Sequence, residues 1–250
     1  MQAAALPWDF ALIFLVLGVV VPWRGLVRVR ALLARPQLSS AERISLYAST
    51  IAFQWLAAGV VVWRAVAHGY GPSALGLSPE KPAPGLAVGA AMAVILVTLQ
   101  IASLRQLSRL PPEKRGHLYE ITSRLMPRNL TEALAFVALV GTVSLCEELL
   151  YRGFAFAVLR EIGGGSAAVA VAGSSVLFAV GHIYQGRRGV ASTLVLGLLL
   201  AGSRSWTGSL LPCIVAHLAV DLVAGLAGRH FAGELQARPE GRQARRHSIQ

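Results

Sequence analysis

Five ionisable side chains lie within otherwise apolar stretches of this 250-residue sequence. They are Glu147, Glu148, His182, His217 and Asp221. A charged group at the centre of a bilayer costs about 3 kcal/mol or more, so such residues usually face the interior of a helix bundle and serve a function there. These five residues are therefore the first candidates for a functional site.

The first motif is the segment CEELLYR at 146–152. On a helix, Glu148 and Arg152 are one turn apart with the acid first, which is the favourable order for an ion pair. Glu147 points about 100° away from Glu148 and has no such partner, so its carboxylate is available for chemistry. The alternative is a structural network in which all three charged side chains hold two helices together.

Two further motifs each place a histidine one helical turn from a second side chain. In FxxxH the ring of Phe178 and the imidazole of His182 share a helix face. In HxxxD a carboxylate, Asp221, can fix the tautomer of His217, as both a metal ligand and an oxyanion donor require. The alternatives are a hydrogen-bonded core histidine at 182 and a polar contact between helices at 217 and 221.

The composition around these motifs is that of a membrane protein. Hydrophobic residues make up 55% of the chain and charged residues 14%, against about 25% charged in an average soluble protein. Because the apolar runs are continuous, we expect an all-α, polytopic transmembrane bundle of about seven spans with a four-helix catalytic core. The expected spans are 6–23, 44–63, 85–104, 131–150 (continuing helically to 159), 166–182, 189–203 and 209–228.

The net charge of +11 comes from basic residues that gather between the apolar runs, at 24–43, 105–128, 187–188 and 229–246. An odd number of spans puts all four groups on one side, so the positive-inside rule predicts an outside N-terminus and a cytoplasmic C-terminus. The charge is divided among loops without a zinc-finger spacing or an RNA-binding aromatic motif. We therefore expect membrane lipids, and no nucleic acid, as partners of the basic residues.

The order of the three motifs resembles that of the CPBP family of intramembrane proteases. EExxxR begins at 147, FxxxH at 178 and HxxxD at 217, each on a separate apolar helix. The family includes endopeptidases that trim CAAX-type prenylated proteins, and bacterial relatives linked to bacteriocin processing or immunity. The resemblance implies a protease core at 130–228, preceded by variable transmembrane helices at 1–129 and followed by a basic, disordered tail at 229–250.

The resemblance also implies roles for these residues in hydrolysing a peptide bond of a membrane-anchored or hydrophobic substrate. By family analogy Glu147 is the general base for a water, with His182 as its partner. His217 and Asp221 occupy positions that stabilise the tetrahedral oxyanion. The supporting residues are Glu148, Arg152 and Phe178. The ion pair between Glu148 and Arg152 is expected to orient Glu147.

Alternatives at the site concern metal, protonation and thiols. Relatives have been described as metalloproteases, and Glu147, His182 and His217 are acceptable zinc ligands. Since no HExxH motif is present, we favour a site without a metal or other cofactor.

Many members carry Asn in place of Asp221, so this carboxylate either orients His217 when ionised or donates to the oxyanion when protonated. The two cysteines are expected to be small core residues rather than nucleophiles: Cys146 and Cys213.

The favoured function is a glutamate-type intramembrane endopeptidase, integral to a bacterial plasma membrane. A non-catalytic membrane scaffold or immunity protein would keep the same fold and bind a partner instead. A transporter with a buried charge relay is less favoured, because the sequence shows neither internal repeats nor paired broken helices. A Glu147→Gln variant separates a protease, which loses cleavage, from a scaffold, which keeps its phenotype.

Overall fold

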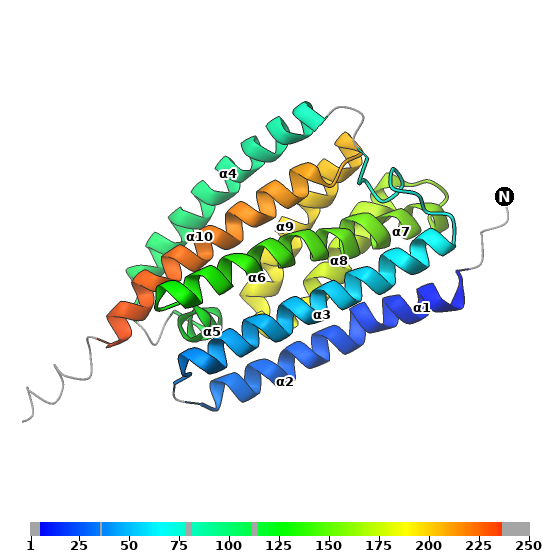
Figure 1. Cartoon of the computed structure of the whole chain (residues 1–250). Helices are drawn as coiled ribbons and strands as arrows, with labels where there is room; N and C mark the ends of the chain where they lie inside the picture. The colour runs from blue at the N-terminus through cyan, green and yellow to red at the C-terminus, as the bar shows by residue number, and fades with distance from the viewer. Residues whose placement is uncertain (1–5, 36, 79–81, 112–114, 237–250) are drawn as a thin grey trace, which may run out of the picture.

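The computed structural model describes residues 6–35, 37–78, 82–111 and 115–236, and these parts are helical with short connections (Figure 1). The expected all-α membrane bundle is confirmed. In chain order the helical segments are α1 (Trp8–Leu15), η1 (Val16–Val20), α2 (Val21–Leu33), α3 (Ser40–Ala67), α4 (Pro82–Ser108), α5 (His117–Leu125), α6 (Leu130–Glu148), η3 (Leu149–Ala155), α7 (Phe156–Ile162), α8 (Ala167–Gly181), η4 (Ile183–Gln185), α9 (Gly186–Thr207) and α10 (Leu211–Gln236).

All seven apolar runs form helices, but the expected count of seven spans is not confirmed. Within the described residues, four helical segments are long and apolar enough to cross a membrane: Trp8–Leu33, Ser40–Ala67, Pro82–Gln106 and Leu130–Ile162. The pair Ala167–Gly181 and Ile183–Thr207 is bent by 56°, and it makes a fifth candidate if it counts as one broken span. The last apolar stretch, Leu211–Gly225, is shorter.

Several helix boundaries differ from the expected ones. The first helix continues past 23 to Leu33 through the π-helical turn η1. The fourth continues beyond 150 as expected, through η3, and ends at Ile162 rather than at 159. The short helix α5 was not expected, because its nine residues are too few and too polar to form an apolar run. Helix α10 extends to Gln236, so the first part of the expected disordered tail is helical, and residues 237–250 lie outside the described residues.

The helices form a bundle in which segments far apart in sequence pack together. Helix α10 packs against α4, α6 and α9, while α3 packs against α6 and α8 against α9. In Figure 1, α4 and α10 lie side by side, as do α3 and α6. The contact between α8 and α9 depends on Gly197, because a Cβ there would lie 3.3 Å from the Cα of Ser175.

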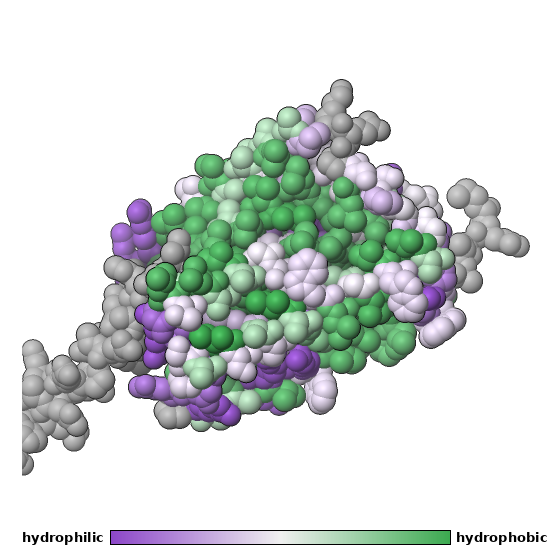
Figure 2. Space-filling model, viewed as in Figure 1, coloured by the Kyte–Doolittle hydropathy of each residue, from purple (hydrophilic) through white to green (hydrophobic). Residues whose placement is uncertain are grey.

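The outer surface is apolar across the middle of the bundle, as a lipid-facing surface requires. Figure 2 shows apolar side chains over the centre of the visible face and hydrophilic ones near the end where α2 meets α3. Three exposed tryptophans lie at the opposite end: Trp8 (78%) begins α1, while Trp63 (65%) and Trp206 (79%) lie near the ends of α3 and α9. Tryptophan is enriched at membrane–water interfaces, so this end carries an aromatic belt.

Buried polar contacts join the first three helices to the rest of the bundle. Nη1 of Arg43 on α3 donates to Glu132 Oε2 on α6 at 3.0 Å, and each side chain is only 1% exposed. Arg124 on α5 donates to the carbonyl of Leu33 at 2.8 Å, which satisfies a backbone acceptor at the end of α2. The first part of the chain is therefore attached to the helices that carry the motifs.

Candidate active site

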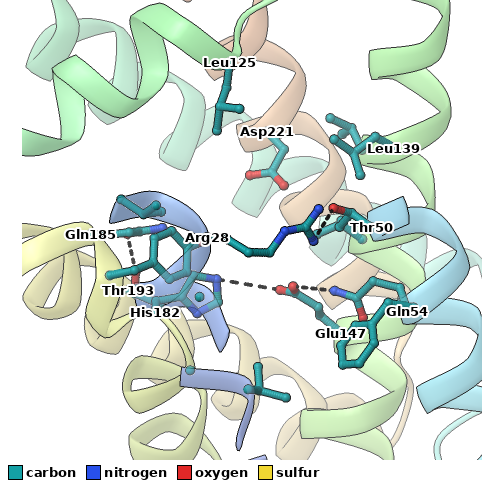
Figure 3. A pocket seen from close by; sticks show the side chains of 18 of the residues that line it. Arg28, Thr50, Gln54, Leu125, Leu139, Glu147, His182, Gln185, Thr193 and Asp221 are labelled. Carbon is teal, nitrogen blue, oxygen red and sulfur yellow. Dashed lines mark hydrogen bonds and ion pairs between the residues drawn. The ribbon is translucent and has the colours of Figure 1, made fainter. Parts of the chain in front are cut away.

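A cavity of about 450 Å³ lies between α2, α3, α6, α8, α9 and α10 and contains the residues singled out by the motifs (Figure 3). Glu147, His182, His217 and Asp221 all line it. The three motifs, which are up to about 70 residues apart along the chain, are thus brought together in one place. The cavity belongs to the half of the bundle that includes the end of α8 and the start of α9.

The carboxylate of Glu147 has two differently placed oxygens. Oε1 accepts a hydrogen bond of 2.8 Å from Nε2 of Gln54 on α3, which fixes the orientation of the carboxylate. Oε2 lies 3.9 Å from Nε2 of His182 and has no hydrogen-bond partner among the described residues, although the atom is buried. One oxygen is therefore held by the protein, while the other is directed toward the histidine.

His182 lies just after the last turn of α8, where the chain bends into η4. Its Nδ1 is 2.8 Å from the carbonyl oxygen of Phe178, and since a carbonyl can only accept, Nδ1 carries the proton. Nε2, on the other side of the ring, faces Glu147. The bond from Nδ1 also satisfies a backbone carbonyl at the end of a helix, so the local structure that ends α8 also aims the imidazole. The Phe178 ring packs on the imidazole, with their centroids 4.6 Å apart.

The pair expected from the EExxxR spacing is present, and it contacts the third motif. Glu148 Oε1 accepts from Arg152 Nη1 at 2.9 Å and also from His217 Nδ1 at 2.8 Å. Glu148 and Arg152 are 0% exposed and the His217 side chain 4%. The pair therefore holds His217, whereas Glu147 is held by Gln54.

Asp221 is the second acid near His217, and it is less closely bound. Its Oδ2 lies 3.6 Å from His217 Nε2, beyond normal hydrogen-bond distance, and its side chain is 34% exposed. Because Glu148 occupies Nδ1, it is Glu148 that fixes the ring, and Asp221 lies beside the nitrogen that faces the cavity.

A π-helical stretch follows the two glutamates. Leu149–Ala155 continues α6 with a wider turn, and such turns are rare and occur frequently at functional sites. Arg152 lies within it, and its guanidinium carbon is 4.1 Å from the centroid of the Phe178 ring on α8. The π turn thus places the buried cation of the EExxxR motif against the phenylalanine of the FxxxH motif.

Many cavity residues come from the part of the chain that was expected to hold only variable extra spans, among them Gln54 and Arg28. Gln54 on α3 contacts Glu147, as described above. Arg28 on α2 reaches into the cavity and donates from Nη2 to Ser49 Oγ at 2.8 Å and from Nη1 to Thr50 Oγ1 at 3.4 Å. The available signal for Gln54 was a polar amide within the apolar run 44–63.

Zinc was the alternative at this site. Within the ranges that the structure describes, no three His, Cys, Asp or Glu side chains form a group that could hold a metal ion. Nδ1 of His217 donates to Glu148, and Nδ1 of His182 donates to a carbonyl, which leaves Nε2 of each ring toward the cavity. Metal-binding histidines make the same bonds, so these contacts do not distinguish the two alternatives. The thiols of Cys146 and Cys213 are buried and do not line the cavity.

Residues 129–223 match a family described as type II CAAX prenyl endopeptidase Rce1-like. The matched segment begins just before α6 and ends within α10, so it contains all three motifs. No curated protein and no solved structure matches the chain. The resemblance indicated by the motif order is confirmed.

Proposed function

Because residues 129–223 form an Rce1-like domain of the CPBP intramembrane protease family in an integral membrane protein, we propose that the chain hydrolyses a peptide bond through a water activated by Glu147 and His182. The observation that carries this proposal is the position of Glu147. One of its oxygens is fixed by Gln54, and the other is buried, has no hydrogen-bond partner among the described residues, and lies 3.9 Å from His182 Nε2.

In the proposed reaction, a water beside Glu147 Oε2 and His182 Nε2 donates a hydrogen bond to each acceptor. Glu147 takes a proton from the water as its oxygen adds to the carbonyl carbon of the substrate. The tetrahedral intermediate then collapses, the C–N bond breaks, and the proton passes to the leaving amine. General base catalysis of this kind contributes about 10²–10⁴-fold to the rate.

The negative charge on the carbonyl oxygen needs a donor, and we assign this role to His217. With a proton on each nitrogen, the ring donates Nδ1–H to Glu148 and Nε2–H to the oxyanion. Glu148 and Arg152 hold the ring before the reaction begins, so no reorganisation is needed as the charge develops. Asp221, beside Nε2, is a positioning residue for the same nitrogen.

The proposed substrate is a membrane-anchored or hydrophobic peptide. The cavity wall includes apolar side chains from several helices, among them Phe53, Phe136, Leu139 and Val143. The basic residues gather near the end where α2 meets α3, so we propose that this end is cytoplasmic and the N-terminus is outside. The membrane that we propose is a bacterial plasma membrane.

The test is cleavage of quenched hydrophobic peptides by the purified, detergent-solubilised protein in excess chelator, together with metal analysis. Wild type is compared with Glu147→Gln and His182→Ala, and with Glu120→Gln as a matched control, since Glu120 is 51% exposed on α5. We expect wild type and the control to cleave and both site variants to lose activity.

Three results would overturn parts of this proposal. Cleavage that survives in Glu147→Gln contradicts the general base. Stoichiometric zinc that is lost in the two site variants favours the metalloprotease alternative. No cleavage by any wild-type preparation favours the non-catalytic scaffold or immunity protein.

A further inference from the structure

Tyr151 contributes a hydroxyl to the cavity that the proposed hydrolysis does not use. The residue lies in the π-helical stretch η3, four positions after Glu147, so the two side chains share a face of the helix. Tyr151 lines the cavity and is only 3% exposed. A buried phenol of this membrane protein is therefore placed on the same wall as the proposed general base.

The contacts of Tyr151 place its hydroxyl beside the second motif. The ring packs edge-on against Phe178, with the centroids 5.1 Å apart. The hydroxyl lies against Gly181, where a Cβ would come within 2.8 Å of the phenolic oxygen. Gly181 directly precedes His182 in the sequence, and both residues line the cavity. The side chain thus extends from the helix that carries Glu147 to the turn that carries His182.

This hydroxyl has no hydrogen-bond partner among the residues that the structure describes. By contrast, Tyr47 is equally buried at the same cavity, and its hydroxyl donates to the carbonyl of Leu125. The unpaired side-chain atoms that are fully enclosed do not include the Tyr151 oxygen, so it is open to the cavity. It also interacts electrostatically with the carboxylate of Glu147. Since buried tyrosine hydroxyls usually have a partner, a small polar ligand near Glu147 is the partner to expect.

The nucleophilic water is such a ligand, and its geometry leaves one position for a further donor. In the proposed reaction its two hydrogens are directed to Glu147 Oε2 and His182 Nε2, which lie 3.9 Å apart. One of its two lone pairs must then attack the carbonyl carbon of the substrate, and the other is free to accept a hydrogen bond. Bound waters in proteins commonly make three such bonds. A donor to the second lone pair would fix the rotation of the water and leave only the attacking lone pair free.

On the premise of the proposed function, we propose that Tyr151 is a further catalytic residue, whose hydroxyl donates a hydrogen bond to the nucleophilic water. The phenol keeps its proton throughout. The water gives one proton to Glu147, and its oxygen forms the new bond to the carbonyl carbon. Tyr151 thereby aims the attacking lone pair at the substrate, and correct orientation of a bound nucleophile lowers the barrier to reaction. Phe178 packs on both Tyr151 and His182, so one buried ring supports two of the groups that hold the water.

The first test removes only the hydroxyl. Tyr151→Phe keeps the ring, and kcat on the best-cleaved peptide is expected to fall about ten- to hundredfold. KM should stay within about twofold, because the hydroxyl contacts the water and not the peptide. The midpoint of thermal unfolding should stay the same or rise, since the hydroxyl has no partner in the described part of the chain. The matched control is Tyr70→Phe, which removes a hydroxyl that donates to Glu161 outside the cavity and should keep the kcat of wild type.

The second test keeps the hydroxyl but displaces it. Gly181→Ala adds a methyl group 2.8 Å from the phenolic oxygen of Tyr151, so the hydroxyl must move. We expect kcat to fall about as far as in Tyr151→Phe. In the double variant the methyl group meets no oxygen, so kcat should equal that of Tyr151→Phe alone. If the two losses multiply instead, Gly181 acts without the hydroxyl, and the position assigned to the hydroxyl is wrong.

Comparison with Glu147→Gln separates a failure of this role from a failure of the proposed function. If Glu147→Gln abolishes cleavage while Tyr151→Phe stays within twofold of wild type, the role of Tyr151 is wrong and the endopeptidase stands. A raised KM with unchanged kcat in Tyr151→Phe means that the hydroxyl contacts the peptide instead of the water, which overturns the proposal. A fall in kcat together with a lower unfolding midpoint shows a structural role and overturns it as well. If wild type cleaves no peptide, the premise has failed and the role of Tyr151 falls with it.

Discussion

The buried carboxylate of Glu148 is expected to stabilise the protein through two donors at once, and this can be tested by a double-mutant cycle. Glu148→Gln leaves the guanidinium of Arg152, which is 0% exposed, without a described counter-charge. Breaking one side of a buried ion pair costs about 3–5 kcal/mol, because the remaining charge stays in the low-dielectric interior. We therefore expect Glu148→Gln to lower the free energy of unfolding by about 4 kcal/mol.

Removing the other partner should cost less. Arg152→Met deletes the charge itself, along with Nε and Nη2, which are buried without hydrogen-bond partners among the described residues. Glu148 keeps the donor Nδ1 of His217 at 2.8 Å. The main loss is then the contact with the Phe178 ring, worth about 1–2 kcal/mol. The double variant should resemble Arg152→Met alone, so the second substitution rescues the first by about 2 kcal/mol, since no isolated buried charge remains.

The free energies can be measured by titrating SDS into detergent micelles and following the fluorescence of the five tryptophans. The reasoning is refuted if Arg152→Met destabilises the protein as much as Glu148→Gln does, or if the double variant shows the sum of the two single effects. Either result would mean that the second donor to Glu148 does not carry the expected share of the interaction.

Three other predictions concern the site and its attachment. Gln54→Ala removes the donor that fixes Glu147 Oε1 at 2.8 Å and should lower kcat about tenfold with KM nearly unchanged, as steady-state kinetics can show; an unchanged kcat would mean that the amide is dispensable. Arg43→Ala strands the 1%-exposed carboxylate of Glu132 and should cost about 3–5 kcal/mol in SDS titration, whereas a cost below about 1 kcal/mol would contradict a buried pair. Gly197→Val places branched atoms against the α8 backbone, 3.3 Å from the position of a Cβ, and should lower the midpoint of thermal unfolding, while Gly202→Val, where a Cβ meets no atom within 4 Å, should not.

Much of the fold followed from the apolar runs, because in lipid a continuous apolar stretch of sufficient length must be helical. Two features had no such signal. The bend of 56° after Gly181 lies in the interval between the apolar runs 166–182 and 189–203, and these runs do not specify the angle at which the two helices meet. Helix α5 has only nine residues, so it falls below the length at which an apolar run is diagnostic.

The site was partly predictable for a related reason. Spacing of i,i+4 reveals neighbours on one helix, so the pair Glu148–Arg152 could be read directly and is present at 2.9 Å. Contacts between helices depend on rotation and depth, which one sequence does not specify. The bond from His217 to Glu148 and the bond from Gln54 to Glu147 are of this second kind. Both changed the expected partners: Glu148 orients the histidine, and an amide from α3 orients the general base.

The most direct test of the central claim is kcat/KM of Glu147→Gln relative to wild type on the best-cleaved peptide, measured on preparations with the same unfolding midpoint. Glutamine is isosteric and can keep the contact with Gln54, but it cannot take a proton from water. We expect kcat/KM to fall by about 10²–10⁴-fold. A variant that folds normally and cleaves within a few fold of wild type would show that Glu147 is not the base and that the reaction depends on other groups.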